Sequence, residues 1–402
     1  MRTAISFLGF NPRGYSRVTY ALPGGAGASF TTELFAEALV HLYQPERLYV
    51  LLTPTAESGV PEGATESVWA TLQRRVESFT EVIPVRGIPE GAEAADFWPL
   101  FEAVTGCVTP GDEVIFDLTH GMRSLPIVAL SSLLYLKSTR HIQLRGLLYG
   151  AFEARQGDLV PIVDLAPLLQ LLEWSYAAET FQRTGEAAPL ATAMGSALPA
   201  LSEALRGLSN ALALARPEET VHAARATQKE LARSQSPLAE LAPLRWLTPD
   251  LERACTPLAG SHHTDPRRDP ALLWTQIPWN LKQGRVMQAV MLAREWLVTV
   301  ECLRLGLSPT DRRVRLQMDK RIGSHMQWWW RGEGDGDDAL DALPGAGMRA
   351  ALWKDLASVR NDLVHCGMLE NSPTSVELLQ RVVRLETTLR AFAKEANIPL
   401  SA

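Results

Sequence analysis

Apolar and polar positions follow two different periods along the chain. Through the first 160 residues, short apolar runs typical of buried strands alternate with stretches whose apolar residues recur every three to four positions, as on one face of a helix. Such alternation predicts a parallel, doubly wound sheet. The predicted strands are 4–10, 48–52, 81–85, 113–116 and 142–149, with 160–163 pairing with the last across a turn, and the predicted helices are 31–43, 68–79, 97–108 and 125–136.

After residue 165 only the helical period remains. The predicted helices are 168–181, 198–214, 221–231, 286–303, 348–363 and 376–392. Residues 234–280 contain seven prolines and are predicted to be a linker or irregular loop. Residues 333–347 are rich in glycine and acidic residues and are predicted to be a mobile surface loop. We therefore predict an α/β domain over 1–164, a helical connector over 165–280 and a helical domain over 281–402.

Composition narrows the class of protein. The 402 residues suit two or three globular domains, and the net charge of −6 argues against a surface that binds nucleic acid throughout. The four cysteines have no C-x-x-C spacing, which favours reduced thiols in a cytoplasmic protein over a zinc ribbon. We expect no secretory signal and no membrane association, because the longest apolar run is shorter than the roughly 18 residues that cross a bilayer.

Polar groups gather directly after the predicted strand 113–116. Residues 117–124 supply a carboxylate, hydroxyls, an imidazole, a glycine and a guanidinium, and a predicted helix follows. In an open α/β sheet, ligands bind at the carboxyl ends of strands, and the N-terminus of a helix attracts anions. This stretch is therefore a candidate anion site, and the alternative is an ordinary strand–helix junction capped by Ser124.

A second candidate site lies near the end of the predicted helix 348–363. Arg360 and His365 are five positions apart, which turns them about 140° away from each other on an ideal helix, while Asn361 shares the face of His365. Two copies of the chain could line one cleft with both pairs. Histidine can exchange a proton at neutral pH and arginine can hold a phosphate, as metal-free transesterification of RNA requires. The alternative is a solvated arginine and a histidine stabilised by the helix dipole.

Residues 280–331 are basic, with ten Lys or Arg against four acidic residues. This excess marks a candidate RNA-facing surface. Trp328, Trp329 and Trp330 could stack bases there, and the alternative is that they are buried.

The two motifs together resemble those of one family. Asp117-x-Thr119-His120-Gly121 resembles the DxTHG motif of CRISPR-associated proteins with a CARF sensor domain, and the segment from Arg360 to His365 resembles the R-N-x-x-x-H form of the HEPN ribonuclease motif. Their order is that of the ancillary ribonucleases of type III CRISPR systems. The resemblance implies a Rossmann-like α/β CARF domain with a parallel sheet, followed by an all-α HEPN domain. Residues 165–280 match no motif.

The resemblance also implies a function. A homodimer of this family binds cyclic tetra- or hexa-adenylate from the type III effector complex as an allosteric activator, and then cuts single-stranded RNA without a metal in antiviral defence. Arg360 and His365 would be catalytic, with Asn361 positioning them. Asp117 would order its turn, since a carboxylate repels phosphate. The implied ligand site consists of Gly9, Asn11, Arg13, Tyr15, Thr53, Asp117, Thr119, His120, Gly121, Met122 and Arg123.

One departure and three alternatives remain. Related chains often have Gly-Thr-Gly-x-Tyr after the first strand, where this chain runs from Gly9 to Tyr15 with Arg13 added, so the ring size stays open. The chain could instead be a ring-binding regulator without ribonuclease activity, with a winged helix in 165–280. It could also cleave the ring itself through Thr119 or His120. A dinucleotide-dependent oxidoreductase would need a G-x-G-x-x-G fingerprint, which is missing.

Overall fold

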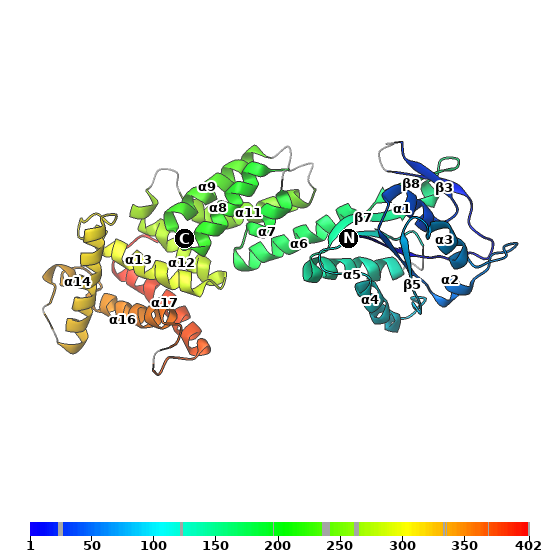
Figure 1. Cartoon of the computed structure of the whole chain (residues 1–402). Coiled ribbons are helices and arrows are strands. Elements are labelled where there is room, and N and C mark those ends of the chain that lie inside the picture. The colour runs from blue at the N-terminus through cyan, green and yellow to red at the C-terminus, as the bar shows by residue number, and fades with distance from the viewer. Residues whose placement is uncertain are drawn as a thin grey trace. The chain divides into compact units, whose positions relative to one another are not determined.

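The computed structural model describes residues 1–22, 27–120, 124–195, 197–234, 242–260, 265–332, 334, 336–368 and 370–400. The chain packs into two compact units, Met1–Leu172 and Glu173–Ala402, and the boundary falls within helix α6 (Ala166–Thr184) (Figure 1). The division of the helical part at residue 280 into a connector and a separate domain stays a prediction.

The N-terminal unit is built on a mixed, mostly parallel sheet. Its described strands have the order β3-β2-β8-β7-β6-β1-β4-β5, and only the pairs β2–β3 and β7–β8 are antiparallel. The predicted parallel sheet is thus confirmed for its central strands, whereas the antiparallel pair β2–β3 was not predicted. The strands are β1 (Arg2–Phe7), β2 (Val18–Ala21), β3 (Ser29–Thr32), β4 (Arg47–Leu51), β5 (Glu81–Val85), β6 (Glu113–Asp117), β7 (Gln143–Gly150) and β8 (Leu159–Asp164).

Two short strands of the sheet, β2 and β3, were not predicted from the sequence. β2 and β3 have four residues each, too few for a period of two to be distinguished, and they pair with each other and with β8. As a result the helix predicted to begin at residue 31 begins only after β3. The predicted antiparallel pairing of 160–163 with 142–149 is confirmed, with Tyr149 opposite Val163.

Helices cover both faces of this sheet. Because neighbouring residues of a strand point to opposite faces, Ala4 of β1 packs with α1 and α3 on one side, whereas Ile5 packs with α4 and α5 on the other. These helices are α1 (Phe35–Tyr43), α3 (Val68–Val76), α4 (Phe97–Gly106) and α5 (Ser124–Arg140), and a short α2 (Pro54–Ser58) follows β4. The two apolar layers hold the sheet's carboxyl edge in place.

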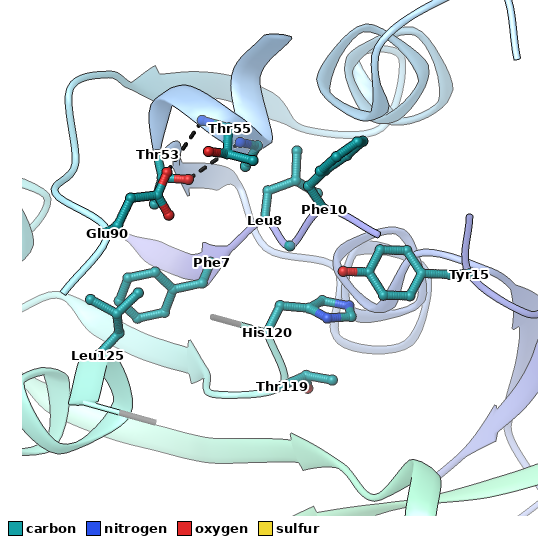
Figure 2. Close-up of a pocket in the computed structure, with 12 residues that line it drawn as sticks. Phe7, Leu8, Phe10, Tyr15, Thr53, Thr55, Glu90, Thr119, His120 and Leu125 are labelled. Carbon is teal, nitrogen blue, oxygen red and sulfur yellow. Dashed lines mark hydrogen bonds between the residues drawn. The ribbon is translucent and has the colours of Figure 1, made fainter. Parts of the chain in front are cut away.

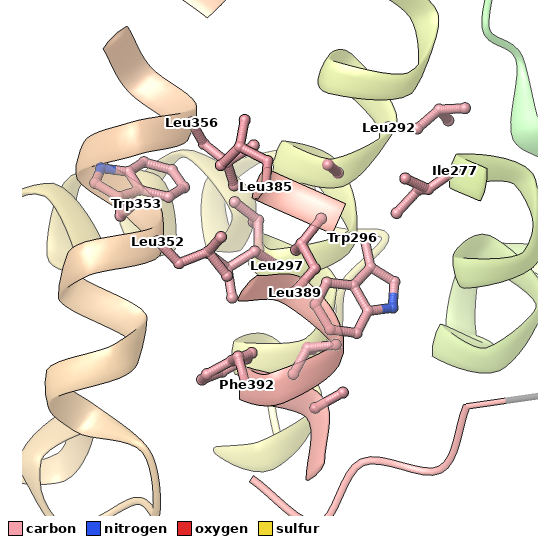
Figure 3. Packing of buried hydrophobic residues seen from close by; sticks show 14 of the residues in the cluster. Ile277, Leu292, Trp296, Leu297, Leu352, Trp353, Leu356, Leu385, Leu389 and Phe392 are labelled. Carbon is pink, nitrogen blue, oxygen red and sulfur yellow. The ribbon is translucent and has the colours of Figure 1, made fainter. Parts of the chain in front are cut away.

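The C-terminal unit is helical throughout its described residues, as predicted. Its helices after α6 are α7 (Ala188–Met194), α8 (Pro199–Ala213), α9 (Pro217–Arg233), α11 (Ala242–Ala259), α12 (Pro270–Lys282), α13 (Val286–Arg304), α14 (Arg312–Arg331), α15 (Asp338–Asp341), α16 (Ala346–Val364) and α17 (Ser375–Glu395). In its larger core, Trp296 of α13 lies 5.5 Å from Trp274 and 6.3 Å from Phe392 between ring centroids (Figure 3). The central position of α13 explains its strong apolar period.

The prediction of an irregular segment over 234–280 is wrong for its described residues, because α11 and α12 lie within it. Pro270 occupies the first turn of α12, where proline is favoured, and the Asp269 carboxylate caps that helix. The mobile loop predicted over 333–347 is also wrong where it is described. Leu340 of α15 is fully buried, and Asp337 lies 2.7 Å from Arg321.

Charged side chains are buried inside the C-terminal unit. Glu301 and Arg349 are both fully buried, with 3.7 Å between Oε2 and Nη1, and Arg304 donates to the other Glu301 oxygen at 2.8 Å. Arg349 also donates to the Leu340 carbonyl at 2.8 Å. Burial raises the pKa of Glu301 and lowers the pKa of Arg349, since water no longer solvates either charge. Each charge is therefore retained because the other is present.

We expect Arg349→Met to lower the free energy of unfolding of the helical unit by about 3 kcal/mol, because it leaves the Glu301 carboxylate buried with one partner fewer. Adding Glu301→Gln should restore part of the loss. Thermal unfolding followed by tryptophan fluorescence measures this unit, since all tryptophans except Trp69 and Trp98 lie in it. A double variant that loses the sum of the two single losses would show that the pair is not coupled.

Candidate functional site

The turn after β6 is held by a buried carboxylate. Asp117 is fully buried, and its two oxygens accept hydrogen bonds from Ser6 Oγ at 2.5 Å and from the Thr119 amide at 2.7 Å. Thr119 Oγ1 accepts from the Gly150 amide on β7 at 2.9 Å. Burial raises the pKa of Asp117 to about 6, against the opposing effect of these two hydrogen bonds. The ends of β1, β6 and β7 are thereby tied together.

A cavity of about 350 Å³ opens above this turn, at the carboxyl edge of the sheet. It lies where β1, β4, β5 and β6 end, as expected for an open α/β sheet. Its lining consists of Phe7, Leu8, Gly9, Phe10, Tyr15, Thr53, Thr55, Ala56, Glu90, Thr119, His120 and Leu125 (Figure 2).

His120 is the most unusual group in this cavity. Its ring lies 4.9 Å from that of Tyr15 between centroids, and its buried Nε2 has no hydrogen-bond partner among the described residues. Burial lowers the pKa of His120 to about 4, so the imidazole is neutral at pH 7. A Cβ on Gly9 would lie 2.4 Å from the Tyr15 hydroxyl and 3.1 Å from the His120 Cβ, so a larger residue there would displace the Tyr15 side chain. The cavity lining thus includes a neutral imidazole packed between Gly9 and Tyr15.

The structure brings some of the predicted ligand residues together and not others. Gly9, Tyr15, Thr53, Thr119 and His120 line the cavity. Asn11 and Arg13 do not: the Asn11 side chain accepts from the Arg13 amide at 3.0 Å within their loop. Asp117 does not line it either. Gly121, Met122 and Arg123 lie outside the described residues.

Sequence reasoning missed two polar groups of the lining. Glu90 follows β5, and its carboxylate accepts from the Thr55 amide at 3.3 Å, across the cavity from His120 (Figure 2). Thr55 follows Thr53, whose hydroxyl caps α2. The order of the strands, which places the ends of β4 and β5 beside β1, is the signal that would have found both.

A second cavity of about 520 Å³ in the same unit is a weaker candidate. It carries Arg17, Arg74 and Arg75, but Arg74 lies 2.6 Å from Glu66, and Arg75 lies 2.7 Å from Glu33. Two of its three guanidinium groups are thus neutralised within the protein.

The residues of the second motif lie at the end of α16. Arg360 is half-buried and donates to Asn361 Oδ1 at 3.0 Å, while Asn361 and His365 are exposed. His365 is the C-cap of the helix. Among the described contacts, none joins Arg360 to His365, in keeping with the angle between them on a helix.

Exposed apolar side chains surround this motif. Val376, Leu379 and Val383 occupy one face of α17 at helical spacing and are between 50% and 67% exposed. Val364 and Met368 flank His365 and are 45% and 85% exposed. We call Val364, Met368, Val376, Leu379 and Val383 the apolar patch.

Comparison with known proteins concerns the N-terminal unit above all. Residues 3–153 match the model of the CARF domain of CRISPR system endoribonuclease Csx1. CRISPR-associated protein MJ1674 of Methanocaldococcus jannaschii is 31% identical over 91 residues, which span 22% of this chain and 14% of that protein. Enterococcus italicus Csm6 bound to cyclic hexa-2'-fluoro-hexa-dAMP is 10% identical, with a TM-score of 0.45, over 100% of this chain and 95% of that one.

The first two matches support a CRISPR-associated protein with a CARF domain in its N-terminal unit. The matched CARF segment contains every residue that lines the 350 Å³ cavity. The predicted winged helix of a transcription regulator is not seen, because the described part of 165–280 contains helices and no strand.

Three further expectations can be compared with the structure. The four cysteines are free thiols, of which only Cys366 is exposed. No described helix is both long and apolar enough to cross a membrane. The described residues also form no group of three or more His, Cys, Asp or Glu side chains placed to hold a metal ion.

We expect His120→Asn to reduce the acid sensitivity of the CARF unit. The pKa of His120 is about 4 in the folded chain and near its ordinary value of about 6.5 when unfolded, so the unfolded state binds a proton first as pH falls. Between pH 7.5 and pH 5 this difference lowers the free energy of unfolding of the wild type by about 2 kcal/mol, and the variant should not show this loss. Asp117 has the opposite effect on stability, since its raised pKa lowers the free energy of unfolding as pH rises. Because the wild type and His120→Asn both contain Asp117, its effect cancels in the comparison.

Hydrogen exchange of β1 and β6 amides at the two pH values measures this difference. The matched control is His141→Asn, since His141 is an exposed histidine of the same unit with φ of 52°, which asparagine tolerates. Equal pH dependence in the wild type and His120→Asn would contradict a buried neutral imidazole.

Proposed function

We propose that this chain is a metal-independent endoribonuclease of type III CRISPR defence, activated as a homodimer by a cyclic oligoadenylate. The observation that carries the proposal is the match of residues 3–153 to the CARF domain of an endoribonuclease, on a chain that also has the Arg360–His365 motif. The 350 Å³ cavity is the proposed sensor site, and the end of α16 is the proposed ribonuclease site.

The chemistry of the cavity suits one part of a cyclic oligoadenylate. Phe7 and Phe10 give it apolar surface for a base, while Tyr15, Thr119 and the neutral His120 offer hydrogen bonds to ribose and base edges. The described lining includes no cation, so phosphates would rely on the N-terminal end of α5. A ring of four or six nucleotides exceeds one such cavity, which favours a site shared by two protomers.

The proposed ribonuclease chemistry needs two groups near one phosphodiester. His365 would take the proton from the 2′-hydroxyl that attacks the neighbouring phosphorus, and Arg360 would hold the charge that develops on the phosphate oxygens. Bond formation from the 2′-oxygen and departure of the 5′-oxygen yield a cyclic phosphate and a free 5′-hydroxyl. Within one chain the two side chains do not meet, which supports a composite site built from two copies.

The apolar patch supports pairing of two copies near that site. Its residues on α17 form a continuous exposed stripe, and burial of such a stripe against a second copy removes apolar area from water. Activation then requires that the ring bind the arrangement of the active dimer more tightly than that of the resting one, because equal affinity would shift nothing.

We expect Tyr15→Phe to weaken ring binding about tenfold, because the cavity loses one hydroxyl at the face of His120. Calorimetric titration with cyclic tetra- and hexa-adenylate measures the affinity and also decides the ring size. Tyr43→Phe is the matched control, since Tyr43 lies in the same unit and outside the cavity lining. Unchanged affinity in Tyr15→Phe would place the ring elsewhere.

We expect His365→Ala to reduce ring-activated RNA cleavage at least a hundredfold while leaving ring affinity unchanged. Cleavage by the wild type should persist in excess EDTA and leave cyclic phosphate ends. His222→Ala, at a partly exposed histidine of α9, is the control. A strict metal requirement would reject the chemistry, and equal loss of cleavage and ring binding would reject the division of roles.

A further inference from the structure

One exposed face of α16 carries four polar side chains in a line. Lys354, Ser358, Asn361 and His365 are all exposed and follow one another at spacings of four, three and four residues, so they lie on the same side of the helix. The line is about 16 Å long at 1.5 Å per residue. Asn361 and His365 belong to the proposed ribonuclease site, whereas the function proposed above gives Lys354 and Ser358 no role.

An aromatic ring stands at the far end of this line. The Lys354 ammonium lies 4.9 Å from the centroid of the Trp330 ring on α14, which packs against α16 (Figure 1). Trp330 is 53% exposed. Trp328 is half-buried, and Trp329 is 45% exposed but lies beside Gly347, where a Cβ would come 2.9 Å from its ring. Trp330 is thus the member of the triplet that is placed beside the line.

A second cation adjoins the middle of the line. Arg381 of α17 donates from Nη2 to Ser358 Oγ at 2.9 Å. No ion pair joins Lys354 or Arg381 to an acidic side chain in the described structure, and the Asp355 carboxylate lines the same small cavity as Arg381 and Arg384. Arg294, by contrast, is neutralised by Asp319 at 2.6 Å. Lys354 thus places a positive charge without an ion-pair partner beside Trp330, and Arg381 places a second beside Ser358.

We propose that Trp330, Lys354 and Arg381 form a track for single-stranded RNA that leads to His365. A base stacks on Trp330, and Lys354 and Arg381 hold phosphates on the way to the proposed ribonuclease site. The inference rests on the proposed function. Positive charge and an aromatic ring that is 53% exposed fit RNA, whose bases can stack and whose backbone is anionic. A second copy of the chain is better matched by the apolar patch, which has no such cations.

Binding is measured on the full chain with His365→Ala, so that a labelled single-stranded RNA of mixed sequence stays intact. Adding Trp330→Ala should weaken binding about tenfold, the usual contribution of one stacked base. Adding Lys354→Gln should weaken binding and lower the slope of log affinity against log salt by about 0.7, as for one lost phosphate contact on a single strand. With His365 present, both changes should raise KM for RNA more than they lower kcat and leave ring affinity unchanged.

The chain offers a matched control in Arg245 and Trp246. This pair on α11 has the same cation–π arrangement, with 5.4 Å between the guanidinium carbon and the ring centroid, and Trp246 is 74% exposed. Trp246→Ala and Arg245→Gln should leave RNA binding unchanged. Trp330→Phe should restore most of the binding lost in Trp330→Ala, because it keeps an aromatic face; failure of this rescue counts against stacking.

The outcomes separate this inference from the proposed function. If the wild type cuts RNA and both track variants bind and cut it normally, the track is wrong and the proposed function stands. If the wild type cuts no RNA with either ring, the proposed function is wrong. If sedimentation shows that Trp330→Ala splits the dimer, the surface is an interface between copies, and the track is overturned.

Discussion

The buried carboxylate of Asp117 is the interaction on which the proposed sensor site depends. A carboxylate without water is tolerated only when hydrogen bonds compensate it, and here the Ser6 hydroxyl and the Thr119 amide do so. These hydrogen bonds fix more than one turn, because the Thr119 hydroxyl also accepts a hydrogen bond from the Gly150 amide of β7. Strands β1, β6 and β7 therefore end at fixed positions relative to one another. His120 follows Thr119 directly, so the contact between the His120 and Tyr15 rings depends on that frame.

Sequence reasoning succeeded where local pattern and final structure agree. The predicted strands 48–52, 81–85 and 113–116 match β4, β5 and β6 to within one residue at each end, because each is a short, continuous run of mainly apolar residues. It failed where tertiary contacts decide. The strands β2 and β3 gain their hydrogen bonds from distant partners, and Glu90 joins the cavity only because β5 lies beside β4. The prolines of 234–280 led to the wrong prediction of an irregular segment, because a proline such as Pro270 is favoured in the first turn of a helix.

The basic excess over 280–331 shows why a count of charges is a poor measure of a surface. Arg294, Arg315 and Arg321 form ion pairs with Asp319, Glu295 and Asp337, so these cations hold helices together. What a partner can reach is set by exposure and pairing, neither of which sequence composition contains. The open charge lies partly outside the counted segment, at Lys354 and Arg381. The members of the tryptophan triplet also differ in exposure, because Trp328 is half-buried whereas Trp329 and Trp330 are exposed.

In the proposed function, the placement of Arg360 and His365 gives a physical reason for control by a second copy. The two residues point in different directions on an ideal helix and no described contact joins them, so an isolated chain would hold an incomplete site. Catalysis by a pair of such sites would depend on the relative position of two copies, and small displacements there change rates strongly, since reacting groups must lie within about 3–3.5 Å of each other. A ligand that binds elsewhere can then regulate cleavage without touching RNA. It needs only to favour one arrangement of the dimer over another by a few kcal/mol.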